Sequence, residues 1–247
     1  MNPTDFKHFA VKAFGVDERH ASSFTPWLKG QAQQLDNTPG VVRVLVTEAD
    51  GSLAAGRALG EFTPSHLVFI EIESPKVNLT KAWAAWEAAL AQGMAALGHE
   101  VKTYVDHTFT ELYPQNRQGK LLSEPSPRTA FVILQEVKPE VEAEYNHWFD
   151  VDDGSAGPGG APISHLAERV SYPGFLRGTR FKVAANHDQP AKDTLINPNY
   201  LTVYELTHAD ALQSEAYTAA MKNAGMGAKG SAGRLFRLVV RHAFLEA

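Results

Sequence analysis

The sequence predicts an α+β fold in which two βαββαβ units in one chain pack their sheets against each other. The first indication is that strand-like and helix-like segments follow one another in the same order twice. The second is a constant spacing between short motifs. PGVVR at Pro39–Arg43 and PGFLR at Pro173–Arg177 lie 134 positions apart (39 to 173), and LVFIE at Leu67–Glu71 and LTVYE at Leu201–Glu205 have the same spacing (67 to 201). The third is that a unit of this kind carries helices on one face of its sheet, so the other face needs a cover that a second copy can supply.

The first half is expected to contain four strands and two helices. The predicted strands are Phe6–Phe14, Val41–Val46, His66–Glu73 and Glu100–Leu112. The first helix starts at about Asp17 and stops before Pro39-Gly40, because its apolar residues recur at helical spacing between these points. Thr80 can cap the second helix, which closes at Gly98.

The second half repeats this order. The predicted strands are Arg128–Val137, Phe175–Val183, Tyr200–Leu206 and Leu235–Phe244. A helix begins at Glu140–Asp150 and resumes at Ile163–Val170, after a Gly/Pro-rich interruption. Another helix, Asp210–Asn223, is expected to take Thr207 as its cap.

These segments divide the chain into a first ferredoxin-like repeat (1–113), a linker (114–127) and a second ferredoxin-like repeat (128–247) with an inserted Gly/Pro-rich loop at 151–162. Upstream of the interruption, Phe9 aligns with Phe131 at an offset of 122, and the difference of 12 from 134 fits the insertion. Two such repeats packed sheet to sheet form an intrachain pseudo-dimeric α/β barrel. Two independent domains joined by the linker are the alternative.

Composition narrows the class of protein. The 247 residues carry a net charge of −5 without a basic run, which argues against a nucleic-acid partner. No apolar stretch is long enough to span a membrane, and the N-terminus does not resemble a signal peptide, so a cytoplasmic location is the simplest expectation. The absence of cysteine excludes disulfides, thiolate nucleophiles and zinc–thiolate sites.

Three segments, EYNHWFD at Glu144–Asp150, PGFLRGTRF at Pro173–Phe181 and YLTVYEL at Tyr200–Leu206, resemble the dimeric α/β-barrel superfamily, and within it EthD-like proteins. The resemblance implies a small hydrophobic ligand and cofactor-free chemistry, although tandem members include the haem-binding chlorite dismutase group. EthD-like proteins commonly carry a histidine three residues after the aspartate of the W-[FY]-D motif. This sequence has Asp153 there, so either His165, beyond the insertion, takes over the role or the usual acid–base group is missing.

Four residues are candidates for catalysis: His165, His147, Tyr204 and Arg177. A histidine can exchange a proton near neutral pH, which suits enolisation or dehydration. Tyr204 stands where the first half has Ile70, so it brings a hydroxyl into a core position. An arginine flanked by phenylalanines needs an anionic partner, either a ligand or a carboxylate. Arg43 occupies the equivalent place, which favours a structural pairing of Arg43 with Glu71 and of Arg177 with Glu205.

Five aromatic residues are candidates for the apolar walls of a substrate site: Tyr145, Trp148, Phe149, Phe175 and Phe181. Strand alternation places Phe175, Arg177 and Phe181 on one face of their strand. The carboxylates Asp150, Asp152 and Asp153 lack the spacing of a calcium loop and predict a solvated helix end, so no metal site is expected.

The leading interpretation is a cofactor-independent enzyme of the lyase, isomerase or cyclase type that acts on a small hydrophobic carbonyl compound. His165 or His147 would move the proton, while Tyr204 and Arg177 would hold the developing oxyanion. The alternatives are a haem-binding tandem barrel, with His165 or His242 as the iron ligand, and a non-catalytic small-molecule-binding or assembly module. Whether the chain forms a homodimer is left open.

Overall fold

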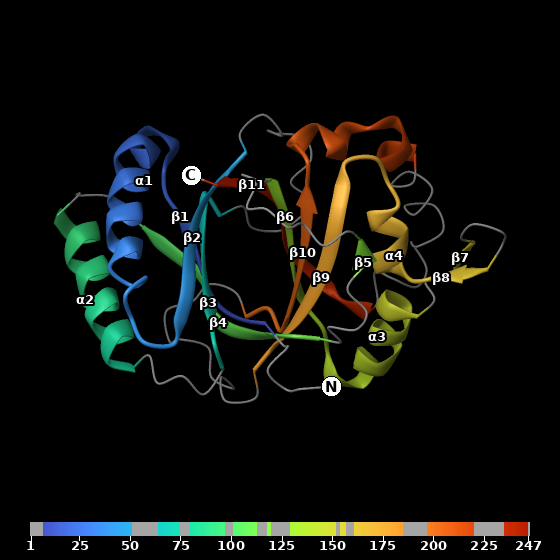
Figure 1. The fold of residues 1–247 in the computed structure, drawn as a ribbon, viewed down its shortest axis with the longest axis horizontal. Coiled ribbons are helices and arrows are strands. Elements are labelled where there is room, and N and C mark those ends of the chain that lie inside the picture. The colour runs from blue at the N-terminus through green and yellow to red at the C-terminus, as the bar shows by residue number, and fades with distance from the viewer. Residues whose placement is uncertain are drawn as a thin grey trace.

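Eight strands form a closed barrel flanked by helices on two sides (Figure 1). The structure is a computed structural model that describes residues 7–50, 64–74, 80–96, 101–112, 118–119, 129–151, 154–156, 161–184, 197–219 and 235–246. The strand order is β10-β6-β11-β2-β3-β1-β4-β9, and β9 pairs in turn with β10, which closes the barrel. The short strand β5 (Gln118–Gly119) pairs with Arg177 and Gly178 of β9, on the edge of β9 that β4 pairs with farther along the strand.

The elements of the first half follow the predicted order, with shifted ends. They are β1 (His8–Gly15), α1 (Glu18–Gln33), β2 (Val41–Ala49), β3 (His66–Ile72), α2 (Thr80–Ala96) and β4 (Lys102–Glu111). Asp17 caps α1, because its side chain accepts a hydrogen bond from the backbone N–H of Arg19 at 3.0 Å. Helices α1 and α2 both cover the outer face of β1–β4 (Figure 1).

The second half has the same order of strands, but its first helical region is divided into two short helices. Its main elements are β6 (Thr129–Glu136), a 3-10 turn (Pro139–Val141), α3 (Glu142–Asp150), α4 (His165–Val170), β9 (Phe175–Val183), β10 (Tyr200–Leu206), a second 3-10 turn (Ala209–Gln213) and β11 (Arg237–Glu246). Inside the predicted insertion, β7 (Ser155–Ala156) pairs with β8 (Pro162–Ile163). The cap predicted at Thr207 is wrong, because the turn begins after His208 and Thr207 Oγ1 instead donates to Gly174 O at 3.4 Å.

The spacing of 134 is exact in the strand ends. Strands β2 (41–49) and β3 (66–72) correspond to β9 (175–183) and β10 (200–206) at that spacing. Gly40 and Gly174 both have φ near +85°, a conformation that glycine adopts at no steric cost. Each of these glycines is followed by a bulge, at Val42 and at Leu176, where the register with the neighbouring strand shifts by one residue.

Both predicted arginine–glutamate pairs are present beyond the bulges. Arg43 Nε donates to Glu71 Oε2 at 2.7 Å, and Arg177 Nε donates to Glu205 Oε1 at 2.8 Å. In each case the two residues are direct cross-strand neighbours. Opposite charges at such positions stabilise a pair of strands.

The alignment of Phe9 with Phe131 is off by one residue. Phe9 pairs with Glu71, whereas the partner of Glu205 on β6 is Ala130, so the structural offset of the first strands is 121 (9 to 130). A slip of one residue moves a side chain to the opposite face of a sheet. Phe9 accordingly packs inside the barrel, while Phe131 packs outside it against the helices.

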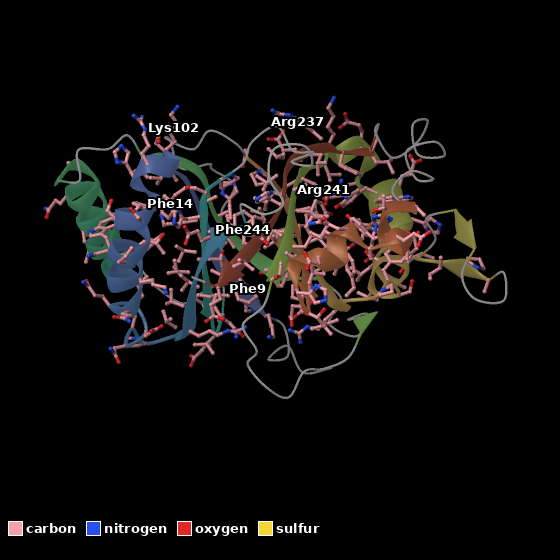
Figure 2. All side chains as sticks on the ribbon, turned by 90° about the horizontal axis from the view of Figure 1, so that it is seen from above. Phe9, Phe14, Lys102, Arg237, Arg241 and Phe244 are labelled. Atoms are coloured by element: carbon pink, nitrogen blue, oxygen red, sulfur yellow. The ribbon has the colours of Figure 1, made fainter. Side chains whose placement is uncertain are left out.

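Three apolar cores follow from the two faces of the barrel. One fills the interior, where Phe9 and Phe244 lie near the middle of the molecule (Figure 2). A second lies between the first half of the barrel and α1 and α2, and includes Phe14 and Phe24. The third lies between the second half and α3 and α4. Within the described part of the chain, no helix is long and apolar enough to cross a membrane.

Buried His66 makes stability depend on pH. Its ring nitrogens bond the hydroxyls of Thr25 at 2.8 Å and Ser65 at 2.9 Å, and burial lowers the pKa of the imidazole to about 4. The unfolded chain, with its ordinary pKa near 6.5, therefore binds the proton first as the pH falls. We expect this group to contribute a loss of about 2 kcal/mol of unfolding free energy between pH 7.5 and pH 5, measured by urea unfolding.

The variant His66→Gln is the control for this prediction. It removes the titrating group and should flatten the dependence on pH by that amount, whatever its own stability at pH 7.5. An equally steep loss in the variant would show that other groups cause it.

Candidate functional site

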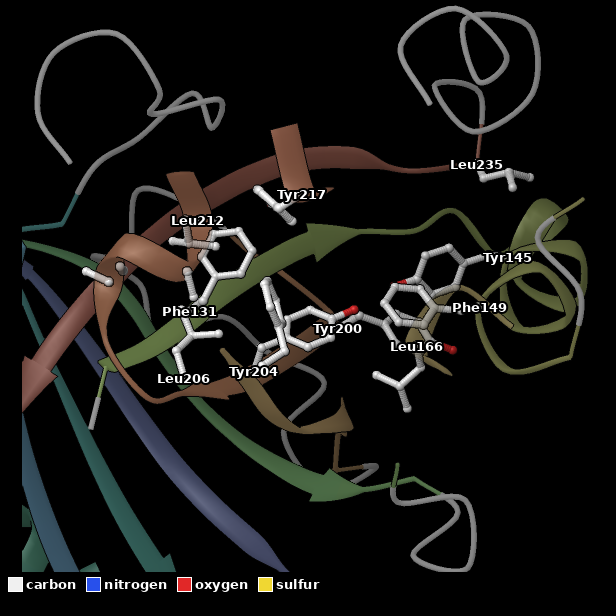
Figure 3. Packing of buried hydrophobic residues seen from close by; sticks show 14 of the residues in the cluster. Phe131, Tyr145, Phe149, Leu166, Tyr200, Tyr204, Leu206, Leu212, Tyr217 and Leu235 are labelled. Carbon is white, nitrogen blue, oxygen red and sulfur yellow. The ribbon is translucent and has the colours of Figure 1, made fainter. Parts of the chain in front are cut away.

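The outer core of the second half is a layer of aromatic side chains between the sheet and helices α3 and α4. Figure 3 shows Phe131, Tyr204 and Leu212 at one end of this layer and Tyr145, Phe149 and Leu166 at the other, with Tyr200 between them. The rings meet mostly edge to face; Tyr145 and Tyr200, for example, have centroids 4.8 Å apart. Several polar side chains are buried in this apolar layer, and for this reason the layer is the candidate functional site.

The Tyr204 hydroxyl lies at the centre of the candidate site. Tyr204 is fully buried, and its hydroxyl has no hydrogen-bond partner. Thr202, two residues away on the same face of β10, is also fully buried, and its hydroxyl likewise lacks a partner. The Tyr204 ring lies over Gly178, where a Cβ would come within 3.0 Å of it. A buried hydroxyl that makes no hydrogen bond costs free energy of folding. We therefore expect a bound molecule to supply acceptors for these two hydroxyls.

Arg180 is the buried cation of β9. It lies directly opposite Thr202 in the pairing of β9 with β10. Its guanidinium forms an ion pair with Asp150 at the end of α3, and Nη2 donates to Asn146 Oδ1 at 3.0 Å. Its Nε has no hydrogen-bond partner. The guanidinium carbon lies 4.1 Å from the centroid of the Phe149 ring, so the charge is held between aromatic faces.

Arg169 is the second buried cation and is bonded to His165. Both residues lie on α4, which Ser164 caps by accepting from Ala167 N at 3.1 Å. Arg169 Nε donates to His165 Nε2 at 3.3 Å. The His165 ring stacks on Trp148, with centroids 4.1 Å apart, and its side chain is 14% exposed. His165 thus lies at the edge of the layer, where it can meet a ligand.

The two arginines act on Tyr204 electrostatically. Burial raises the pKa of the Tyr204 hydroxyl above its ordinary value, and the charges of Arg169 and Arg180 oppose that rise. The phenol is therefore neutral and can donate a hydrogen bond. Each arginine also has a carboxylate beside it, because Asp150 pairs with Arg180 and Glu168 Oε2 lies 3.9 Å from Arg169 Nη1. These four charges sum to zero.

The structure gathers most of the predicted site residues in this layer. Tyr145, Phe149, Phe175 and Tyr204 belong to the buried cluster, with Trp148 packed against it and His165 stacked on Trp148. Tyr145 donates to Gln135 Oε1 at 2.7 Å, and burial raises its pKa to about 12. His147 is different, because it lies on the exposed side of α3.

Arg177 and Phe181 lie on the other face of β9. The expectation that Phe175, Arg177 and Phe181 share one face is wrong, because the bulge at Leu176 changes the alternation between the first two. Phe175 packs outside the barrel, whereas Phe181 packs inside it. Arg177 is paired with Glu205 on the interior side, and so it does not converge with His165 and Tyr204.

Sequence reasoning missed Arg169, Arg180 and Thr202. Strand alternation placed Arg180 on the face of Gly178, but nothing in the sequence showed that this face is the one that meets the helices. Arg169 stands in an ordinary stretch, HLAERV, without a motif. Among the residues that the structure describes, no group of histidine and acidic side chains could hold a metal ion. Asp152 and Asp153 lie outside the described residues.

Comparison with known proteins identifies the fold. No protein-family model matches the sequence, and no curated protein matches it significantly. Among solved structures, the chain is similar to an anthrone oxidase-like protein, with 13% identity, a TM-score of 0.52 and coverage of 99% of this chain and 92% of the other. It is also similar to a variant of the chlorite dismutase from Candidatus Nitrospira defluvii, with 10% identity, a TM-score of 0.51 and coverage of 100% and 93%. The chain therefore shares the α+β barrel fold of these structures.

Removing the partner of Arg180 should destabilise the protein strongly. The variant Asp150→Asn leaves a guanidinium that is almost fully buried without its counter-charge, and breaking such a pair costs about 3–5 kcal/mol. The measurement is urea unfolding of the variant and the parent at pH 7.5. Glu136→Gln is the matched control, because its pair with Arg237 is largely exposed and should cost less than about 1 kcal/mol. Equal losses in both variants would contradict the burial argument.

Proposed function

We propose that the protein is an EthD-like, cofactor-independent enzyme of the lyase, isomerase or cyclase type that acts on a small hydrophobic carbonyl compound. The observation that carries this proposal is the Tyr204 hydroxyl, which is fully buried, lacks a partner and lies in the field of Arg169 and Arg180. A neutral phenol of this kind can donate to a carbonyl oxygen and keep donating as that oxygen becomes negative.

The chemistry begins with removal of a proton from the carbon beside the carbonyl group. The electron pair of the broken C–H bond moves toward the carbonyl oxygen, which becomes an enolate oxygen, and the proton passes to Nε2 of His165. Tyr204 and Thr202 donate hydrogen bonds to the oxygen, while Arg169 and Arg180 stabilise its charge. In an isomerisation, His165 as an acid returns the proton to another carbon of the enolate. In a cyclisation, the enolate carbon bonds to the carbon of a second carbonyl group of the substrate, and the oxygen of that group takes the proton. In an elimination, a C–O bond breaks and the proton goes to the leaving oxygen.

The charge balance of the site favours a neutral substrate. Asp150 and Glu168 already offset the two arginines, so a carboxylate or phosphate would gain little attraction and would lose its hydration. The surrounding rings favour a flat aromatic body. The name of the anthrone oxidase-like relative is in keeping with this class, because an anthrone is a neutral aromatic ketone.

The proposal includes two features of the chain as a whole. We infer that it is a tandem duplication of a ferredoxin-like unit, and the exact spacing of 134 between β2–β3 and β9–β10 supports this. Either half alone would leave one face of its sheet uncovered, which explains why both are kept in one chain. The cytoplasmic location and a homodimer stay predictions.

The second candidate is a haem-binding barrel, as the likeness to chlorite dismutase suggests. An axial ligand needs a histidine nitrogen that faces the iron. In this structure both predicted ligands already have other partners: His165 Nε2 accepts from Arg169 while the ring stacks on Trp148, and the buried His242 is bonded to the backbone of Asp50.

Titration of the purified protein with haemin tests this candidate. We expect no saturable Soret band at one equivalent of haemin, because His165 would have to break two contacts to reach iron. A sharp Soret band that is lost in His165→Ala would instead establish the haem protein and set aside the enzyme proposed above.

Substitution of two residues tests the enzyme. With a panel of neutral aromatic ketones as substrates, anthrone among them, we expect Tyr204→Phe and His165→Ala each to lower kcat by roughly 100-fold or more, because one loses an oxyanion donor and the other the base. Product formation is measured by mass spectrometry. The exposed His208→Ala is the control.

Turnover that is unchanged in both site variants would overturn the proposal. Binding of the ketones without any turnover, measured by quenching of tryptophan fluorescence, would point to the non-catalytic binding module instead.

A further inference from the structure

The hydrogen bond between Arg169 and His165 fixes the protonation state of the imidazole. An arginine side chain only donates hydrogen bonds, so Nε2 of His165 must accept and cannot carry a proton. In the neutral ring the proton then lies on Nδ1, which is 3.8 Å from Glu168 Oε2. The nitrogen that serves as the base in the proposed function is therefore occupied while the site holds no ligand.

The guanidinium of Arg169 does not use all of its hydrogen-bond donors. The residue is 5% exposed and lies over the rings of Tyr172 and Tyr217, with its guanidinium carbon 5.8 Å and 5.7 Å from their centroids. Its Nη1 makes no hydrogen bond, and Glu168 lies at 3.9 Å from it. Such a cation is held in place by aromatic faces rather than by a full set of acceptors.

We propose that Arg169 is a positioning residue that holds Nε2 of His165 until the oxygen of a ligand takes over the guanidinium. When Arg169 turns to that oxygen, the lone pair of Nε2 is released and His165 becomes a competent base. The release of the base rests on the proposed function, because the base acts on the same ligand. The fixed tautomer is independent of it, because it concerns the protein without ligand.

The exchange is favourable because the two acceptors differ in strength. The bond to His165 is long, at 3.3 Å, and its acceptor is neutral. The guanidinium carries its charge in both bonds, but an oxygen that carries negative charge adds an ion-pair attraction that the neutral imidazole cannot supply. Arg169 therefore prefers the ligand oxygen as charge develops on it. Release of the base and stabilisation of the developing oxyanion are therefore coupled through the same guanidinium.

Trp148 and Glu168 keep His165 in place during this exchange. The stacked indole holds the plane of the imidazole, and the carboxylate of Glu168 stabilises the proton on Nδ1. Glu168 is itself fixed by a hydrogen bond from the hydroxyl of Tyr172. Loss of the Arg169 bond thus releases the lone pair of Nε2 without moving the ring.

Nitrogen NMR of histidine-labelled protein without ligand tests the tautomer directly. The His165 signals are assigned by their absence in His165→Gln. In the parent protein at pH 7.5 we expect the pattern of an imidazole with a protonated Nδ1 and a bare Nε2. In Arg169→Met, Nε2 loses its donor, so the signals should shift toward those of a mixture of the two tautomers. Arg43→Gln, a distant arginine of the first half, is the control and should leave the pattern unchanged.

Two results would overturn the inference. One is a protonated Nε2 in the parent protein, a measurement that requires no variant to fold. The other is an unchanged tautomer in folded Arg169→Met. If the tautomer is as expected but His165→Ala keeps full turnover, the proposed function fails while the role of Arg169 in fixing the ring stands.

Kinetics with an active ketone test the release step. Arg169→Met should lower kcat by roughly 10-fold or more and change KM little, because the arginine is engaged mainly when charge develops. Arg169→Lys keeps the charge and should recover part of kcat. A rise in KM with unchanged kcat would show that Arg169 only binds the substrate.

Discussion

Closure of the barrel is the constraint on which the rest of this structure depends. The two halves meet along two seams, β4 with β9 and β11 with β2, and each seam has only three paired positions. These seams leave no free edge in the ring of eight strands, and they give every strand an inner and an outer face. The inner faces are buried against each other, so only the outer faces can carry helices and a site that a ligand can reach.

The two halves use their outer faces differently. In the first half, α1 and α2 span 16 and 17 residues and cover an aliphatic and aromatic core. In the second half, α3 and α4 span only 9 and 6 residues, and the core beneath them contains buried ionic and hydroxyl groups. Thr202 and Tyr204 lie at the positions that correspond to Val68 and Ile70 of the first half, so β10 carries two hydroxyls where β3 carries two apolar side chains. This difference gives the second half the unpaired hydroxyls of the candidate site.

The charged and polar groups of this site interact with one another through ion pairs and hydrogen bonds. Asp150 and Glu168 keep the arginines neutralised, which limits the cost of burying them. Arg169 links His165 to Tyr204, because it donates a hydrogen bond to the imidazole and its charge opposes the rise in the Tyr204 pKa. Under the proposed function, this neutral arrangement would stabilise a charge that develops during the reaction rather than one that a ligand brings with it.

The sequence alone determined the order of the strands, the spacing of 134 and the pairing of Arg43 and Arg177 with their glutamates, because these depend on local periodicity and on motifs that occur twice. It also directed attention to Tyr204, His165 and the aromatic residues around them. Only the tertiary structure decided which face each side chain takes. The bulge at Leu176 and the one-residue difference at Phe9 invert that choice, and a bulge depends on the pairing of two strands that lie far apart in the sequence. For the same reason the sequence favoured Arg177, while in the structure the charges of Arg169 and Arg180 are the ones that act on the Tyr204 hydroxyl.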